Sequence, residues 1–286
     1  MPGFIDMHTH TAASDGSMQP DELVRYAEGC GLNAIAVTDH DTVDGLASAQ
    51  KAAQGLSIEV INGIELSADY PQELHILGYF IDPYAAILQG AVHQLQKWRG
   101  VRNGQMIDRL GELRFAITRE DVLARKPGAD MASIGRVHMA LALVEKGYIA
   151  TVQEAFDEYL TKTGKAYIER QRFSPEKSIE IIKQAGGYAF FAHPILTQKD
   201  PDKLGALIDE LIEYGIDGIE CYHTEMTEEF SSLCLSICRS RGLMVSGGSD
   251  FHGTNRPEVT LGRVYGGQYV EADLLTEIKR KIGLID

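Results

Sequence analysis

Short apolar runs alternate with longer amphipathic stretches along most of this chain of 286 residues. Several runs are rich in β-branched residues, which is typical of buried parallel strands. We predict seven strands, over residues 3–7, 33–38, 58–64, 74–80, 188–192, 216–221 and 243–246. The amphipathic stretches predict helices over residues 20–30, 43–54, 175–185, 201–214 and 227–241. This alternation favours an α/β barrel or a doubly wound sheet.

Residues that begin and end helices stand where these predicted helices need them. Ser174 is an expected N-cap, and Pro175 follows it in the first turn, where proline loses no hydrogen bond. Gly31, Gly215 and Gly242 follow three of the helices, as expected for residues that end a helix in the left-handed conformation. The helix boundaries are therefore predicted by signals that are separate from the apolar pattern.

Residues 98–172 interrupt the alternation, because they show helical patterns and no clear strand. Helices are predicted over residues 101–113, 119–126, 134–146 and 151–159. We therefore predict one α/β domain made of residues 1–97 and 173–286, with a helical subdomain of residues 98–172 inserted into it.

Composition places the chain among soluble globular proteins. Hydrophobic residues make up 44% and charged residues 24%, and no apolar run approaches the ~18–20 residues that span a bilayer. The first residues, MPGFIDMHTH, lack the basic and apolar regions of a secretory signal. Four cysteines are too few for a disulfide framework, and we predict that Cys234 and Cys238 are small core residues of a helix. We expect a cytoplasmic protein without a membrane partner.

Charge is distributed unevenly along the chain. The 27 basic and 41 acidic residues give a net charge of −14. This balance disfavours binding to duplex DNA, because that affinity comes largely from Lys and Arg on phosphates. Residues 97–172, however, carry 14 Lys or Arg and 10 Asp or Glu, a net charge of +4. A mildly basic insertion in an acidic body suits a small anionic ligand.

Histidine and carboxylate residues gather at the ends of the predicted strands. Seven of the nine histidines lie there, namely His8, His10, His40, His75, His193, His223 and His252. In an α/β barrel such strand ends converge on one mouth. His8 and His10 share one face of their strand, and Asp250 and His252 repeat that spacing. Imidazole and carboxylate groups together bind Zn, Mn or Fe(II), so the pattern predicts a metal site. His93 lies in a helical stretch, and we expect it at the surface.

Four of these blocks match a known family. Residues 6–10 (DMHTH), 38–40 (TDH), 192–194 (AHP) and 249–252 (SDFH) resemble the signature blocks of the PHP (polymerase and histidinol phosphatase) family of metal-dependent phosphoesterases. The resemblance covers the whole chain. It implies a distorted (β/α)7 TIM-like barrel with an inserted helical subdomain, and a site for three divalent metal ions at the barrel mouth.

The same resemblance implies which residues would hold the metals. His8, His10, Glu65 and Asp250 would hold the first ion. Glu65 would bridge to the second ion, which His75 and His193 complete, and the third would lie among Asp15, His40 and His252. Many relatives have His at the position of Asp15, and a carboxylate there favours a harder ion. We expect Mn²⁺, with Zn²⁺, iron or Mg²⁺ as alternatives.

Four residues beside these ligands have candidate supporting roles. Asp6, Asp39 and Asp41 are expected to orient the imidazole rings from outside the metal site. For Asp41 an alternative is open, because it also stands where it could cap a helix that starts near residue 43. Tyr222 is either a surface for stacking a base or part of the core.

The insertion resembles the branch of the family that removes phosphate from nucleoside 3′,5′-bisphosphates and trims short 5′-phosphorylated RNA. Residues 134–138 (IGRVH) and 163–167 (TGKAY) carry this match. It implies a hydrolase that removes the 3′-phosphate of such a bisphosphate by means of a hydroxide bridging two metals. A histidinol-phosphatase-like or other small-molecule phosphatase is the alternative within the family.

Arg136 and His223 are the candidate catalytic residues. Arg136 would clamp a phosphate with two hydrogen bonds, and Lys165 would add a point charge. His223 would bind phosphate or protonate the leaving oxygen. Arg170 and Arg172 are weaker candidates for a second phosphate, since both suit a solvated surface. The insertion would then act as a lid over the anionic substrate.

Two functions outside phosphoester chemistry are the remaining alternatives. An amidohydrolase-type enzyme often bridges its metals with a carboxylated Lys, but Glu65 fills that position and no Lys lies at a predicted strand end. A metal-binding module without catalysis would usually lack some ligands, and all nine expected positions are filled. Metal analysis together with a phosphatase assay separates these functions.

Overall fold

The computed structural model describes residues 3–128 and 130–286. The chain divides into two compact units, which we call the barrel unit (residues 1–90 and 173–286) and the helical unit (residues 91–172). The division falls within a long helix, α3 (Ala86–Glu112). This helix begins well before residue 101, where the sequence predicts its start, because no proline interrupts it and Leu88, Val92 and Leu95 are buried at helical spacing.

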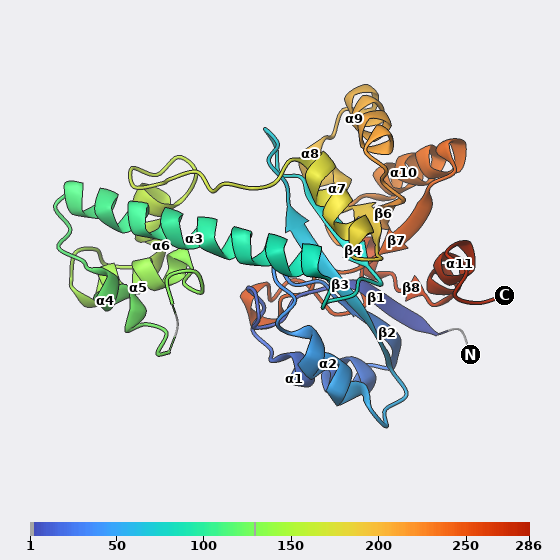
Figure 1. Cartoon of the computed structure of the whole chain (residues 1–286), viewed down its shortest axis with the longest axis horizontal. Coiled ribbons are helices and arrows are strands. Elements are labelled where there is room, and N and C mark those ends of the chain that lie inside the picture. The colour runs from blue at the N-terminus through green and yellow to red at the C-terminus, as the bar shows by residue number, and fades with distance from the viewer. Residues whose placement is uncertain (1–2, 129) are drawn as a thin grey trace. The chain divides into compact units, whose positions relative to one another are not determined.

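Eight strands form one sheet that curves into a nearly closed barrel (Figure 1). In chain order they are β1 (Phe4–Thr9), β2 (Leu32–Val37), β3 (Glu59–Ser67), β4 (His75–Tyr79), β5 (Tyr188–Phe191), β6 (Gly218–Tyr222), β7 (Met244–Gly247) and β8 (Val270–Glu271). Their order across the sheet is β7-β6-β5-β4-β3-β2-β1-β8. A parallel bridge between Thr9 and Phe251 joins β1 to the segment after β7. The predicted TIM-like barrel is confirmed, and all seven predicted strands are present.

Two strands depart from the expected parallel arrangement. β4 runs antiparallel to both β3 and β5. Only residues 68–74 connect β3 to β4, whereas a parallel crossover needs a dozen residues or more. β8, which the sequence did not predict, pairs antiparallel with β1 over two residues. Because β4 is reversed, its first residue, His75, lies at the same edge as the last residues of its parallel neighbours.

A register shift in β1 changes which side chains face the barrel interior. Between Asp6 and Thr9 the pairing with β2 shifts by one residue, as in a β-bulge. Met7 packs in the buried core, and both His8 and His10 contact Glu65 on β3. A regular strand would have turned Met7 and His8 to opposite faces.

Helices lie outside the strands of the barrel unit (Figure 1). They are α1 (Pro20–Gly29), α2 (Leu46–Ala53), α7 (Pro175–Gln184), α8 (Pro194–Thr197), α9 (Pro201–Glu213), α10 (Glu228–Arg241) and α11 (Asp273–Lys281). Ser174 caps α7 as predicted, because its hydroxyl accepts a hydrogen bond from the Lys177 amide. Gly242 follows α10 with a φ of 72°, the left-handed conformation that was predicted there.

The helical unit has a hydrophobic core of its own. Besides most of α3 it contains α4 (Arg119–Leu123), α5 (Arg136–Glu145) and α6 (Val152–Ala155), which continues into a π-helical turn (Phe156–Leu160). No strand occurs in residues 91–128 and 130–172. Met106, Leu110, Met139 and Leu143 are fully buried in one cluster. The unit therefore packs its helices around a core that needs no sheet.

Smaller expectations from the sequence can be checked directly. Cys234 and Cys238 are buried in α10, as predicted, and their thiols are free. His93 lies exposed on α3, also as predicted. Across residues 3–128 and 130–286, no helix has the length and apolar character needed to span a bilayer.

Candidate metal centre

The strand ends of the barrel unit hold all nine predicted metal ligands. They are His8 and His10 on β1, Asp15 in the following loop, His40 after β2, Glu65 on β3, His75 at the start of β4, His193 after β5, and Asp250 and His252 after β7. Six of the nine are buried. Segments spread over most of the barrel sequence therefore deliver their His and carboxylate groups to one edge of the sheet.

Four of these side chains form a tight cluster around the end of β1. The Nε2 atom of His8 lies 3.3 Å from Oε2 of Glu65 and 3.4 Å from Oδ1 of Asp250. The Nε2 atom of His10 lies 3.3 Å from the same Glu65 oxygen and 3.1 Å from the same Asp250 oxygen. One ligand atom from each residue lies within 4.8 Å of the other three, a spacing at which four side chains can share one ion.

Glu65 stands between this cluster and a second group. Its Oε1 atom lies 2.9 Å from Nδ1 of His75 and 2.9 Å from Nε2 of His193. Its Oε2 atom faces the first cluster and also lies 2.9 Å from Nδ1 of His40. The two oxygens of one buried carboxylate therefore point to two different sets of imidazoles, which is the geometry of a bridging ligand.

Asp15 and His252 extend the cluster towards solvent. The Oδ1 atom of Asp15 lies 3.2 Å from Nε2 of His252, and its Oδ2 atom lies 3.9 Å from Nε2 of His40. Together with His10, these three residues place their ligand atoms within 4.8 Å of one another. The Asp15 side chain is 57% exposed, so this part of the centre reaches solvent.

Several buried atoms of the centre lack the hydrogen bonds that burial normally requires. Among the described residues, no hydrogen-bond partner meets Nε2 of His8, either ring nitrogen of His10, Nδ1 of His193 or Oε2 of Glu65. Leaving a buried polar atom unpaired costs roughly 1–3 kcal/mol. Imidazole nitrogens and carboxylate oxygens that converge in this way fit divalent transition metals.

Mutual attraction outweighs burial in setting the charges of Glu65 and His10. Burial alone raises the pKa of Glu65, but the imidazoles of His40, His8 and His75 hold that pKa well below its usual range. Burial likewise lowers the pKa of His10, yet Asp250 and Glu65 raise it to about 10. The carboxylates are thus ionised and stabilise the protonated imidazoles beside them. A metal ion that binds here displaces the protons from such imidazoles.

Glu220 on β6 is a supporting residue that the sequence analysis missed. Its Oε1 atom lies 3.0 Å from Nδ1 of His8, and its Oε2 atom accepts a hydrogen bond of 2.7 Å from the His193 amide. The residue is fully buried. An acidic residue in the middle of an apolar strand was the available signal, since buried charges are almost always paired.

The predicted supporting aspartates bind the loops rather than orienting imidazole rings. Asp6 accepts hydrogen bonds from the amides of Ser249, Gly262 and His8, and its contact with His8 is to the main chain. Asp39 accepts hydrogen bonds from Thr11 and Ser14. These carboxylates therefore fix the backbone that carries the ligands.

Asp41 lies in the loop after β2 and does not cap a helix. The alternative that it caps a helix is wrong, because α2 begins at Leu46 with Gly45 as its N-cap. Its carboxylate instead accepts a hydrogen bond of 3.1 Å from the Ser67 amide at the end of β3. Asp41 thereby ties the loop after β2 to the strand that carries Glu65.

His223 is fully buried beside the first cluster. Its Nδ1 atom accepts a hydrogen bond of 3.1 Å from the Glu225 amide. Because an amide can only donate, Nδ1 carries no hydrogen and the neutral ring has its hydrogen on Nε2. That Nε2 atom lies 3.7 Å from Oδ2 of Asp250, so the ring presents a hydrogen-bond donor to the centre.

Arg136 and Lys165 belong to the helical unit. Arg136 begins α5, where its Nη1 atom donates a hydrogen bond of 3.1 Å to the Leu160 carbonyl and its guanidinium lies 5.9 Å from the centre of the Phe156 ring. Lys165 is exposed and forms an ion pair of 2.8 Å with Glu158. Arg172 forms an ion pair of 3.0 Å with Glu169. Lys165 and Arg172 are therefore already neutralised by neighbouring carboxylates.

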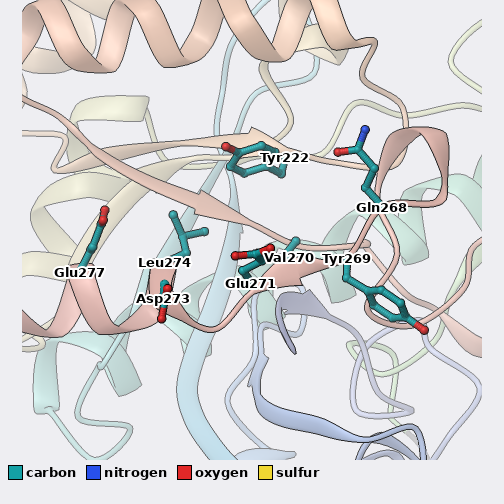
Figure 2. A pocket seen from close by; sticks show the side chains of 8 residues that line it. All are labelled: Tyr222, Gln268, Tyr269, Val270, Glu271, Asp273, Leu274 and Glu277. Atoms are coloured by element: carbon teal, nitrogen blue, oxygen red, sulfur yellow. The ribbon is translucent and has the colours of Figure 1, made fainter. Parts of the chain in front are cut away.

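A cleft on the barrel unit opens at the histidines. This cleft of about 290 Å³ is lined by Asp15, His40, Glu65, Glu73, His75, His193, Leu196, Asp250, His252, Asn255 and Arg256. Neither Asn255 nor Arg256 was among the residues predicted from the sequence. A second cleft, of about 370 Å³, lies between Tyr222, β8 and α11 and holds none of the predicted ligands (Figure 2). Tyr222 packs against the barrel core beside it, which favours the core role for that ring.

Comparison with known proteins identifies relatives that span most of this chain. The PHP domain family matches residues 6–173. A 5′-3′ exoribonuclease of Haemophilus influenzae is 31% identical over 86% of this chain and 89% of its own length. A 3′,5′-nucleoside bisphosphate phosphatase of Chromobacterium violaceum is 32% identical over 87% of each chain. A phosphoribosyl 1,2-cyclic phosphate 1,2-diphosphodiesterase of Eggerthella lenta is 28% identical over 87% of this chain and 94% of its own.

Solved structures agree with the barrel described above. A structure from Bifidobacterium adolescentis, described as a metal-dependent phosphoesterase, superposes with a TM-score of 0.80 at 31% identity and covers 98% of both chains. A Chromobacterium violaceum structure, described as an amidohydrolase with bound sulfate and no metal, has a TM-score of 0.79 at 28% identity and covers 99% of this chain and 96% of its own. With its sequence blocks, its barrel and its clustered ligands, this chain belongs to the PHP family and is a metal-dependent phosphoesterase, and hence a hydrolase.

Proposed function

We propose that this phosphoesterase removes the 3′-phosphate of nucleoside 3′,5′-bisphosphates, and that it also acts on short 5′-phosphorylated RNA. The observation that carries the proposal is the clustering of the nine candidate ligands, seven of which line one cleft, with Glu65 between two groups of imidazoles. Relatives named for each of these activities match most of the chain. In the reaction, the oxygen of water bonds to phosphorus, the bond from phosphorus to the ribose oxygen breaks, and that oxygen takes a proton.

The ligand groups support a site for three divalent ions, with Mn²⁺ as the first choice. His8, His10, Glu65 and Asp250 would hold one ion, Glu65 with His75 and His193 the second, and Asp15 with His40 and His252 the third. Distances of 2.9–3.9 Å between nitrogen and oxygen atoms within these groups support this division. When bound, such ions lower the pKa of water and offset the charge of phosphate oxygens.

His223 is best suited to donate a hydrogen bond to the substrate. The Glu225 amide faces Nδ1, so a second ring proton would point at another hydrogen. This arrangement leaves the Nε2 hydrogen to bind a phosphate oxygen or the leaving oxygen. Of the two roles considered for His223, phosphate binding is therefore the better supported.

The helical unit is proposed to bind the second phosphate as a lid. Positive charge gathers there around Arg102, whose pKa is lowered to about 10 by burial and then by the neighbouring guanidiniums of Arg136 and Arg170. A phosphate among these side chains would relieve their mutual repulsion. Arg136 is the proposed anchor, while Lys165, with Glu158 as its partner, would contribute less.

The test is phosphate release by the Mn²⁺-loaded protein from adenosine 3′,5′-bisphosphate. Parallel reactions contain 5′-AMP, histidinol phosphate, phosphoribosyl 1,2-cyclic phosphate, a 5′-phosphorylated RNA pentamer and an N-acyl amino acid. Strong release from the bisphosphate, leaving 5′-AMP, supports the proposal. Preferred turnover of histidinol phosphate, the cyclic phosphate or the amide would replace it with that activity, and no turnover of any compound would favour a binding module.

Arg136→Ala is expected to lower kcat/KM for adenosine 3′,5′-bisphosphate by roughly 10–100-fold, since a hydrogen bond to a charged group contributes about 1.5–3 kcal/mol. Turnover of 3′-AMP, which lacks the second phosphate, should change little, and metal content should stay at the wild-type value. Arg119→Ala is the matched control, because Arg119 is an exposed arginine of the same unit. Loss of metal in Arg136→Ala would remove the lid assignment.

A further inference from the structure

Arg256 connects the metal centre to the loop that follows β7. Its Nη1 atom donates a hydrogen bond of 2.6 Å to Oδ2 of Asp250, and its Nη2 atom donates one of 2.9 Å to Oε1 of Glu225. Its Nε atom lies 3.5 Å from Oε1 of Glu258. The side chain is 26% exposed and lines the cleft at the histidines. Among the described residues that line this cleft, it is the one Arg or Lys.

The contact with Arg256 orients Asp250 so that its two oxygens face different groups. Oδ1 faces the Nε2 atoms of His8 and His10, at 3.4 Å and 3.1 Å. Oδ2 is turned away from them towards Arg256. The backbone of Asp250 is held as well, because its φ is 60° and its amide donates a hydrogen bond of 2.9 Å to the His8 carbonyl. Without Arg256, rotation about the last side-chain bond could turn both oxygens towards His8 and His10.

Glu225 links Arg256 to His223. Its carboxylate holds Nη2 of Arg256, and its own amide fixes the ring of His223 through Nδ1. The Nε2 atom of His223 and the Nη1 atom of Arg256 then approach the same Asp250 oxygen, at 3.7 Å and 2.6 Å. One residue thus orients both donors that face Oδ2.

We propose that Arg256 is a positioning residue of the metal centre, which holds Asp250 so that Oδ1 alone is presented to the first ion. The inference rests on the proposed function, and specifically on Asp250 as a metal ligand. A direct role in binding substrate fits the contacts less well. All three nitrogen groups of the guanidinium already face carboxylates, and an incoming phosphate would have to displace Asp250.

The test compares Mn²⁺ binding to the full chain and to Arg256→Gln by titration calorimetry, with bisphosphate kinetics measured alongside. Partners that orient metal ligands typically change metal affinity by about 10–100-fold, so we expect Arg256→Gln to weaken binding of the tightest ion by that factor. Its loss of kcat should be recovered at high Mn²⁺, with KM unchanged. Arg256→Lys should restore much of the affinity, because an ammonium can still donate to Oδ2.

Arg263→Gln is the matched control. Arg263 follows the same strand and stacks on Tyr269, and its hydrogen bonds go to the Gly267 carbonyl and the Tyr269 hydroxyl. Its Mn²⁺ affinity should equal that of the wild type. If Arg256→Gln does not fold, Glu225→Gln makes the same test, since it removes the carboxylate that holds Nη2 and should weaken Mn²⁺ binding in the same direction.

Unchanged Mn²⁺ affinity in Arg256→Gln would overturn the proposal, and a raised KM in that case would make Arg256 a substrate-binding residue. Asp250→Asn separates this failure from that of the proposed function. If Asp250→Asn also binds Mn²⁺ normally, the ligand assignment is wrong. If Asp250→Asn loses Mn²⁺ and Arg256→Gln does not, only the positioning role is wrong.

Discussion

Replacing Glu65 by Gln is expected to lower phosphate ester hydrolysis by roughly 10²–10³-fold, which corresponds to about 3–4 kcal/mol of lost transition-state stabilisation. Glu65 presents one oxygen to His75 and His193 and the other to His8 and His10. An amide keeps the shape of the side chain, but it has no charge and its nitrogen cannot accept or ligate. We therefore expect metal content to fall together with activity, as measured by elemental analysis and phosphate release.

Glu59→Gln is the control for this experiment, because it makes the same chemical change at the other end of the same strand. Glu59 is exposed and pairs with Lys279 at 2.6 Å. Both its metal content and its activity should match the wild type. A Glu65→Gln protein that keeps its metal and its turnover would show that the bridging assignment is wrong.

Asp6→Ala is expected to lower the free energy of unfolding by about 4 kcal/mol. The buried carboxylate accepts hydrogen bonds from the amides of Ser249 (2.9 Å), Gly262 (2.7 Å) and His8 (3.2 Å), and from the Ser249 hydroxyl. Alanine leaves these buried donors without a partner, at roughly 1–3 kcal/mol each. Because the donors lie on β1 and on two segments after β7, the closure of the barrel is expected to weaken.

Urea unfolding followed by far-ultraviolet circular dichroism measures this effect. A chelator is present throughout, so that metal binding adds nothing to the stability of either protein. Asp209→Ala serves as the control, because Asp209 is exposed and its ion pair with Arg241 is screened by solvent. It should leave the transition nearly unchanged. An Asp6→Ala transition that coincides with that of the control would contradict the role assigned to Asp6.

The parts of the fold that follow from neighbouring residues were predicted well. Strand positions follow from apolar runs, and helix ends follow from caps such as Ser174 and Gly242. The candidate histidines were also found in the sequence, because strand ends such as the one that carries His8 and His10 meet at one edge of a barrel. These features depend on residues a few positions apart, or on a general property of the barrel. Glu65 and Asp15 were expected as ligands only from the resemblance to the PHP family.

Features set by contacts between distant segments could not be predicted in this way. The pairing of β4 with β5 joins two strands that the whole helical insertion separates in sequence. Glu220 supports His8 across 212 positions of sequence. His40 was expected in the third ligand group, yet its Nδ1 atom also approaches Glu65 at 2.9 Å.

The sequence by itself determined the class of this protein: the alternating elements, the residue types at the strand ends, and the chemistry that imidazole and carboxylate groups allow. Only the tertiary structure decided which oxygen of Glu65 or Asp250 faces which ring. It also decided that the shift in β1 lets Met7 enter the core while His8 and His10 reach Glu65. The hydrogen bond from Arg256 to Asp250 was likewise visible only there. The physical reason is the distance along the sequence over which each effect acts. Propensity and periodicity act over a few residues, whereas the orientation of a buried side chain is set by whichever distant segments pack around it.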